Sequence, residues 1–497
     1  MRCASEGRAW RLLSQIRVRR VTDSRSQGNE PLCPVPKSAV GATPGFCLPA
    51  FLILISSDHS VRLLGSGDIP VPGEKRRRPD KNTMSKANYE WRQIPNGPRL
   101  AVATVADSEC AALTIHVPAG SRNESDLPAG LAHFVEHMVF KGTQRRSVRE
   151  LSFEIENAGG QINACTSEDQ TVYEGRGEAE LLPILADVLA DMVWHATFPE
   201  SEIPLEREVI GEEITMYRES PADHIGDLIS NALWGAHPLG NPISGSLESI
   251  ARIDRQALLA FRDRHHFRND LVIAAAGPFT ADEVLKVIAP HLPQHFHPAE
   301  TCVPFERALA SARTIREPRE TDQLQLSLAW HTPGRHAASR HALRLLSMML
   351  GETASSRLFL ELREERGLCY QIGSDVTFFH ETGAFEINAG LDPEAKDEAL
   401  ACIHREIHDL VTHGPRPGEL ERGKRLMIAQ SKLAFESTAA HASWAGEGVL
   451  DFGRIPPLAE WRNDVLAVTD ADVQSIAREI FHDHNPAIAE IGPLTGT

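Results

Sequence analysis

Residues 206–220 read EREVIGEEITMYRES, and a second segment, ERGKRLMIAQSKLAFES, fills residues 421–437. Each is expected to form a helix that begins at Glu-Arg, and the two starting points lie 215 residues apart. Further along, 251–257 (ARIDRQA) resembles 467–473 (AVTDADV), and each leads through a helix into a terminal strand, LVIAAAG or AIAEIG. Self-similarity at a fixed separation indicates a duplicated structural unit.

A chain of 497 residues is too long for one ordinary hydrophobic core. From Met84 onward, apolar strand-like runs alternate with helical ones, which is an α+β pattern. We therefore expect two homologous α/β-sandwich domains in tandem, each a mixed sheet with helices packed on it, over residues 84–300 and 319–497. Residues 301–318, rich in Pro and charge, are the predicted linker.

Residues 1–83 show no sustained helical or strand period, so we expect no fold there. Met84 then begins MSKANYEWRQIPNGPRLAVATV, which predicts a strand, a turn at Asn96-Gly97 and a second strand. Two interpretations of the leader stay open. Either the start is mis-assigned and Met84 is the true first residue, or the Arg-rich run at residues 8–20 belongs to an organellar transit peptide.

The formal charge of −17 is unevenly distributed. Residues 1–83 hold 14 Lys/Arg against 7 Asp/Glu, and the rest of the chain holds 37 against 61. An acidic body of this kind repels nucleic acid and anionic membrane surfaces, and it attracts cationic ligands such as basic peptides. The other interpretation is that the charge serves only solubility. We expect a peptide partner and no nucleic acid.

The longest apolar run, Cys47–Ile55, is roughly half as long as a membrane-spanning helix needs to be, so no membrane span is predicted. The eight cysteines include no C-x-x-C pair and no spacing typical of disulfides. This favours a reducing compartment. The prediction is a cytoplasmic protein, with the mitochondrial matrix as the alternative if the leader is a transit peptide.

Residues 130–143 read GLAHFVEHMVFKGT and contain the motif H-x-x-E-H. His133 and His137 are four residues apart, so both imidazoles leave the same face of a helix. Neutral imidazole is a good zinc ligand, and a carboxylate beside the metal, here Glu136, can take a proton from the metal's water. The motif is the inverse of the commoner H-E-x-x-H of zinc peptidases. The other interpretation is two histidines packed on an amphipathic helix.

A catalytic zinc normally has three protein ligands and leaves a fourth position for water. Glu206 and Glu213 are seven residues apart on a predicted long helix, so they share one face. One of them can bind the metal and the other can support the site.

The motif HFVEHMVFKGT, followed 76 residues after His137 by Glu213, resembles the pitrilysin and insulinase-type zinc peptidases, and is most similar to the short bacterial members that are like the mitochondrial processing peptidase. The resemblance covers residues 84–497. It implies one Zn²⁺ per chain held by His133, His137 and Glu213. It also implies that Glu136 is the general base and that Glu206 supports the site.

The same resemblance implies further site residues. Residues 159–166 (GGQINACT) are similar to the family's substrate-binding edge strand, where Asn163 and Ala164 would contact the peptide backbone. Arg363 and Tyr370, seven residues apart in the second domain, match the family's Arg/Tyr pair and would stabilise the oxyanion. The implied activity is that of a zinc metalloendopeptidase, which hydrolyses short or unfolded peptides inside an enclosed chamber.

Family members of this length resemble half of a clamshell, so the resemblance implies a homodimer or a heterodimer with a related subunit. In that assembly Arg363 and Tyr370 would face the metal of the partner chain. Two alternatives remain. The chain is a scaffold subunit that has kept the fold alone, or it is a peptidase that acts only with a different partner chain.

Overall fold

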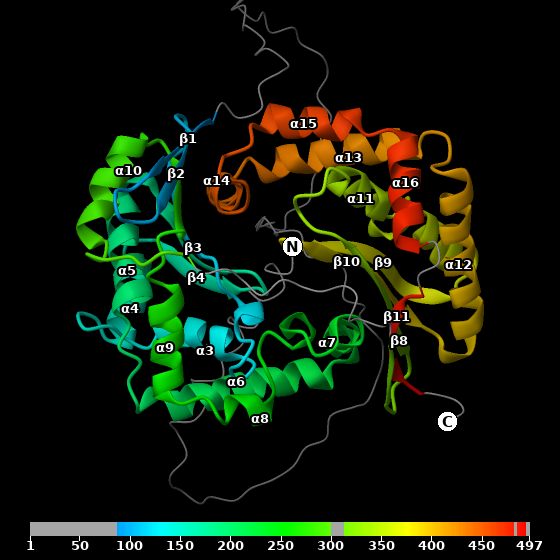
Figure 1. The fold of residues 1–497 in the computed structure, drawn as a ribbon, viewed down its shortest axis with the longest axis horizontal. Coiled ribbons are helices and arrows are strands. Elements are labelled where there is room, and N and C mark those ends of the chain that lie inside the picture. Colours follow the sequence, from blue (N-terminus) through cyan, green and yellow to red (C-terminus); the bar gives the residue numbers. More distant parts are fainter. Residues whose placement is uncertain (1–86, 300–312, 482–484, 494–497) are drawn as a thin grey trace, which may run out of the picture. The chain divides into compact units, whose positions relative to one another are not determined.

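The computed structural model describes residues 87–299, 313–481 and 485–493. They contain two β-sheets with helices packed against them, and Figure 1 shows the two sheets in succession along the chain. This confirms the predicted α+β class with two sandwich domains. The leader 1–83 lies outside the described residues, as do residues 301–312 of the predicted linker.

The first sheet has six strands in the order β1-β2-β6-β3-β5-β4. Their bounds are β1 Asn88–Gln93, β2 Arg99–Thr104, β3 Cys110–Val117, β4 Gln161–Thr166, β5 Thr171–Glu178 and β6 Val272–Gly277. The helices of this half are α3 Leu131–Val139, α4 Val148–Asn157, α5 Leu182–His195, α6 Glu202–Glu219, α7 Pro221–Trp234, α8 Leu247–Ile250, α9 Arg255–His265 and α10 Ala281–Ile288.

The predicted hairpin at the start of this half is confirmed. Strands β1 and β2 pair antiparallel, and Asn96 adopts a positive φ of 55° in the turn between them. Asparagine tolerates this left-handed conformation better than most residues do. Strand β6, fully buried, then pairs parallel with β2 and antiparallel with β3, which makes the sheet mixed.

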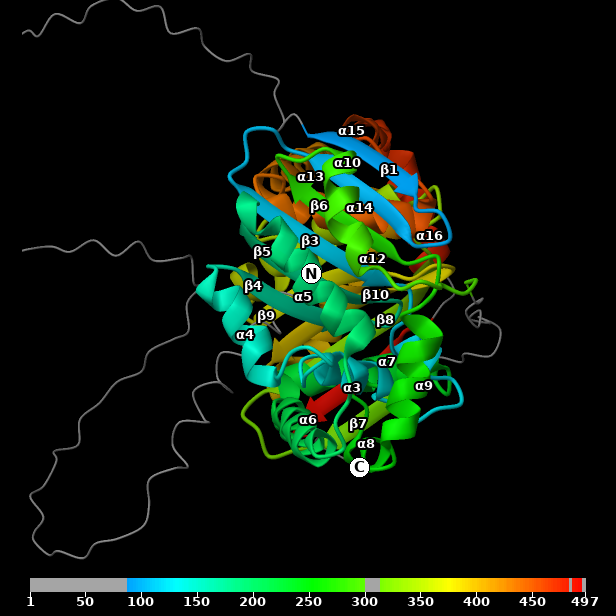
Figure 2. The ribbon, with the colours of Figure 1, turned by 90° about the vertical axis from the view of Figure 1, so that its left-hand side faces the viewer.

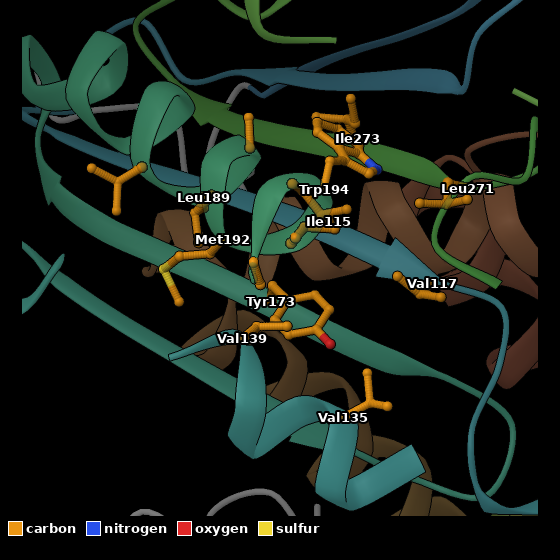
Figure 3. Packing of buried hydrophobic residues seen from close by; sticks show 14 of the residues in the cluster. Ile115, Val117, Val135, Val139, Tyr173, Leu189, Met192, Trp194, Leu271 and Ile273 are labelled. Atoms are coloured by element: carbon orange, nitrogen blue, oxygen red, sulfur yellow. The ribbon is translucent and has the colours of Figure 1, made fainter. Parts of the chain in front are cut away.

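One face of the first sheet carries large apolar side chains that pack against α3 and α5. Figure 3 shows Ile115 and Ile273 on the sheet, Val135 and Val139 on α3, and Leu189 on α5, all in one core cluster. Because α3 is held by this core, the position of its histidines is set by packing and not by a loop.

The second sheet has five strands in the order β7-β11-β8-β10-β9. Their bounds are β7 Thr314–Pro318, β8 Leu324–Pro333, β9 Cys369–Phe378, β10 Thr382–Leu391 and β11 Ala487–Gly492. The α-helices of this half are α11 Arg340–Ser347, α12 Lys396–His413, α13 Glu419–Ala434, α14 Thr438–Phe452, α15 Leu458–Ala467 and α16 Asp470–Phe481. Two π-helical segments, Met348–Glu352 and Phe359–Glu365, follow α11.

The sequence predicts that residues 314–318 belong to the linker, but they form strand β7, which pairs parallel with β11. The segment TIREP is short and sits at the edge of its sheet, where alternate side chains stay exposed. Its charged residues and terminal Pro are tolerated in an edge strand. The same residues are typical of a linker, so the sequence does not predict this strand.

The two halves exchange one helix each. Helix α7 of the first half packs on β8 and β11 of the second sheet, and α14 of the second half packs on β2, β3 and β6 of the first. The sheet faces that receive these helices are rich in alanine, including Ala101, Ala103 and Ala274 under α14. Small side chains let a helix approach the sheet closely, so the exchange joins the halves through buried apolar contacts.

Figure 2 shows the strands of the first sheet one below another behind α5, with β4 below β5 at the end of the series. Among the described strands, β4 pairs only with β5, so one of its edges has no strand partner. Among the described residues, no helix combines the length and the apolar character that a membrane crossing would need.

Candidate metal centre

Helix α3 places both histidines of the motif, and its N-terminus is fixed by two local features. Gly130 caps the helix with a φ of 93°, a left-handed conformation that favours glycine. The buried carboxylate of Glu124 accepts hydrogen bonds from the backbone N–H groups of Gly130 (3.0 Å) and Ala132 (2.6 Å). Burial raises the pKa of Glu124 to about 8, although these backbone bonds oppose the shift.

His133 and His137 lie beside each other on α3, with ring centroids 4.5 Å apart. Glu213 lies on the long helix α6. Its Oε1 is 3.9 Å from His133 Nε2, and its Oε2 is 3.7 Å from His137 Nε2. Ligand atoms at about 2.0–2.2 Å from a tetrahedral zinc are separated by roughly 3.3–3.6 Å. Taking one ligand atom from each residue, the three atoms lie within 4.8 Å of one another, so the side chains would move closer together on binding the ion.

These three residues are the only group of at least three His, Cys, Asp or Glu side chains, among those that the structure describes, whose ligand atoms converge in this way. Two imidazole nitrogens and one carboxylate oxygen form a donor set typical of catalytic zinc. The donor chemistry therefore fits a zinc ion.

Glu206 precedes Glu213 by seven residues on the same face of α6, and it orients His137. Its Oε1 lies 2.9 Å from His137 Nδ1, so a proton on Nδ1 would leave Nε2 free to bind a metal. Its other oxygen forms an ion pair with Lys141, which is two residues beyond the end of α3. Glu206 is 2 % exposed, so these two partners satisfy a buried carboxylate.

The surroundings shift the pKa values of these groups in opposite directions. Burial, together with the neighbouring His137, lowers the pKa of His133 to about 4, which keeps its imidazole neutral. Burial also disfavours protonated His137, but the bond to Glu206 and the nearby carboxylates outweigh it and raise the pKa of His137. Burial raises the pKa of Glu213, whereas His137 and Lys141 overcome burial and lower the pKa of Glu206.

Glu136 is also buried, at 6 % exposed, and its Oε2 accepts a hydrogen bond of 2.5 Å from the Thr166 hydroxyl. Thr166 is the last residue of β4, so the edge strand reaches the motif helix at this point. Three carboxylates thus gather here, two of them buried and that of Glu213 half-buried, and among the described residues Lys141 is the one Lys or Arg paired with any of them. Such an excess of negative charge favours a bound cation.

The predicted substrate residues lie on β4. Asn163 is exposed and pairs with Glu174 of β5, and half-buried Ala164 pairs with Tyr173. Because β4 is an edge strand, its free side can accept an additional strand.

Arg363 and Tyr370 lie close to each other, but neither contacts the three residues of the candidate metal centre. The Arg363 guanidinium carbon lies 5.8 Å from the centre of the Tyr370 ring and 4.7 Å from that of Phe359. Tyr370 is 62 % exposed at the start of β9, the edge strand of the second sheet.

Three residues of the site were missed in the sequence: Glu124, Lys141 and Thr166. Lys141 has a sequence signal, because it follows His137 by four residues and so continues the same helical face. Glu124 and Thr166 have none, since each meets α3 only through the tertiary fold.

Comparison with known families agrees with this architecture. Residues 101–246 match the family described as Insulinase (Peptidase family M16), and residues 252–427 match the one described as Peptidase M16 inactive domain. The chain is 31 % identical over 398 residues to the Bacillus subtilis protein named uncharacterized zinc protease YmxG, covering 80 % of this chain and 97 % of that protein. The chain belongs to peptidase family M16. This confirms the resemblance found in the sequence.

Other M16 relatives show the same extent. A Streptomyces coelicolor protein named uncharacterized zinc protease SCO5738 is 29 % identical over 408 residues, which cover 81 % of this chain and 89 % of the relative. A solved structure titled peptidase M16 inactive domain, from Pseudomonas fluorescens, matches with a TM-score of 0.76 at 21 % identity, covering 82 % of this chain and 99 % of that one. At this identity, the match supports the shared M16 fold.

Proposed function

We propose that this chain is a zinc metalloendopeptidase whose metal is held by His133, His137 and Glu213. The observation that carries the proposal is the convergence of these three ligand atoms, with His137 buried and His133 and Glu213 half-buried, in a site that holds three carboxylates. Membership of family M16 and relatives named zinc proteases support a zinc-dependent peptidase. The single converging group among the described residues supports one ion per chain.

Zinc at this site would supply Lewis acidity to the scissile carbonyl and to a water molecule. Glu136 would remove a proton from that water as it attacks the carbonyl carbon, and would later deliver the proton to the leaving amine. Glu206 would hold His137 in the tautomer that presents Nε2. The free edge of β4 would bind the peptide as an additional strand, with Asn163 and Ala164 touching its backbone.

Metal removal tests this proposal. We expect a zinc chelator to reduce hydrolysis of a quenched peptide library by more than about 100-fold, because both carbonyl polarisation and water activation depend on the ion. Adding back zinc at about one equivalent per chain should restore the rate. Elemental analysis of the purified protein that finds no metal, together with no chelator-sensitive hydrolysis, would favour a scaffold subunit instead.

We further propose that the active assembly is a dimer, closing a chamber in which short or unfolded peptides are cut. Arg363 and Tyr370 have no contact with the metal group of their own chain, and Tyr370 is well exposed. Both observations support a role across a subunit interface, at the partner's metal. The acidic body of the chain supports a preference for basic peptide segments, and its bacterial relatives support a cytoplasmic location over a mitochondrial one.

Complementation between two inactive variants tests the dimer. Glu136→Gln and Arg363→Ala would each inactivate both sites of their own homodimer. After an equal mixture has re-paired at random, half of the dimers are mixed and hold one intact site, so about one quarter of wild-type activity should return. No recovery after verified subunit exchange would place Arg363 at the site of its own chain or outside the site. Activity that appears only with a related second chain would indicate an obligate heterodimer.

A further inference from the structure

The general base proposed above has a polar partner that none of the assigned roles includes. Thr166 is 3 % exposed and donates a 2.5 Å hydrogen bond to Glu136 Oε2. Its hydroxyl also lies 3.4 Å from Thr171 Oγ1. A hydroxyl has one proton to donate, and a short bond to a carboxylate is stronger than a long bond to a neutral oxygen. The Thr166 proton therefore belongs to Glu136.

The neighbouring threonine completes this assignment. Thr171 Oγ1 donates to the backbone oxygen of Ala119 at 3.0 Å, so its own proton is used and it does not compete with Glu136 by donating to Thr166. Thr166 and Thr171 are also paired across β4 and β5. The backbone of both residues is thus set by the sheet, and the Thr166 hydroxyl is left to point at Glu136.

The turn after Thr166 is anchored on both sides. Within it, the backbone N–H of Ser167 donates to Gln170 O at 2.8 Å. Asp169 forms ion pairs with Arg122 of the first half and with Arg335, which follows β8 in the second half. Arg335 also forms an ion pair of 2.5 Å with Asp451 of α14. The position of Thr166 is therefore fixed by contacts that reach across the exchanged helix.

The backbone on the other side of the turn leaves little freedom. The N–H groups of Ser121 and Arg122 donate to Ser167 O (3.1 Å) and Glu168 O (3.0 Å). A Cβ at Gly120 would overlap these same carbonyl groups, so glycine is required for the close approach. A hydroxyl held by such a frame can select one rotamer of a flexible glutamate.

We propose that Thr166 is a positioning residue that holds the Glu136 carboxylate in its reactive orientation. This rests on the proposed peptidase function. The bond engages Oε2 and holds the carboxylate with Oε1 free of this bond to receive a proton from water. Thr166 also ends the strand to which the substrate would add, so peptide binding and the orientation of the base share one element.

The test compares Thr166→Val, which keeps the shape but removes the hydroxyl, with Thr166→Ser, which keeps the hydroxyl. For the zinc-loaded full chain we expect kcat on a quenched peptide to fall about 10- to 100-fold in the Val variant, because a misplaced catalytic group costs roughly that much. KM and zinc content should stay within about twofold, since neither the edge strand nor the ligands change. The Ser variant should retain kcat within about threefold of wild type.

Thr332→Val is the matched control, because Thr332 is an equally buried threonine of the second sheet whose hydroxyl donates to the backbone oxygen of Pro333. It should leave kcat unchanged. A double variant gives the sharpest result: on a Glu136→Gln background, Thr166→Val should lower the residual rate by less than about twofold, since Thr166 acts through Glu136.

Outcomes for the two proposals are separable. A wild-type protein without chelator-sensitive hydrolysis would refute the peptidase function itself. An active wild type with an equally active Thr166→Val variant, or additive losses in the double variant, would refute the positioning role alone. If the Val variant does not fold, Thr166→Ala takes its place under the same criteria.

Discussion

Glu136→Gln is expected to abolish nearly all peptide hydrolysis while the protein keeps its zinc. Glutamine has almost the same shape as glutamate and can still accept the hydrogen bond from Thr166, but it cannot take a proton from water. General base catalysis contributes about 10²- to 10⁴-fold, so kcat should fall by that factor. Steady-state kinetics on the zinc-loaded variant measure the change.

Two controls make this result specific. Zinc content should stay at that of the wild type, because Glu136 is outside the converging ligand group. Gln substitution of the exposed Glu212 on α6 changes the net charge by the same amount and should leave kcat within about twofold. A Glu136→Gln variant that hydrolyses peptide at the wild-type rate would remove Glu136 from the mechanism.

The sequence predicted most of this site because its signals are local. Helical geometry alone predicts that His133 and His137 share one face, and that Glu206 and Glu213, two turns apart on a long helix, share another. Both segments are helical in the structure, as α3 and α6. The contact between α3 and α6 was expected only from the family resemblance, because the hydrophobic periodicity of a helix does not predict which other helix it contacts.

Other features were beyond the reach of local patterns. An amphipathic helix shows that it has an apolar face, but not which sheet covers that face, so the exchange of α7 and α14 between the halves was not foreseen. The bond from Thr166 to Glu136 joins residues thirty positions apart through the docking of β4 beside α3. Nothing in the local sequence around a single threonine in a strand predicts a contact of this kind.

The exchange of helices also bears on function. The turn that follows β4 is tied through Asp169 and Arg335 to Asp451 on α14, so residues of the second half hold an element of the first half's site. A second domain without a metal group among its described residues can therefore contribute to the proposed catalysis by fixing the geometry of the first. This provides a physical reason for a duplicated fold to persist with a single site.

Glu213→Gln is expected to cause the largest loss, because it removes a ligand and not only a proton acceptor. A neutral amide oxygen is a poor zinc ligand compared with a carboxylate, and the two imidazoles alone leave the ion incompletely held. We expect zinc affinity to fall by more than about 100-fold, exceeding the usual effect of residues outside the ligand set. Hydrolysis at limiting zinc should fall with it.

Thermal unfolding provides a readout of this loss that does not depend on activity. A ligand that binds only the folded chain at 100 times its dissociation constant stabilises it by about 2.7 kcal/mol, so zinc should raise the unfolding temperature of the wild type. Glu213→Gln should lose this rise at the same zinc concentration, whereas the neighbouring Glu212→Gln should keep it, since Glu212 is exposed and outside the converging group. An unchanged zinc-dependent rise in Glu213→Gln would mean that α6 does not supply the third ligand, and that the metal is held in a different way from the one proposed.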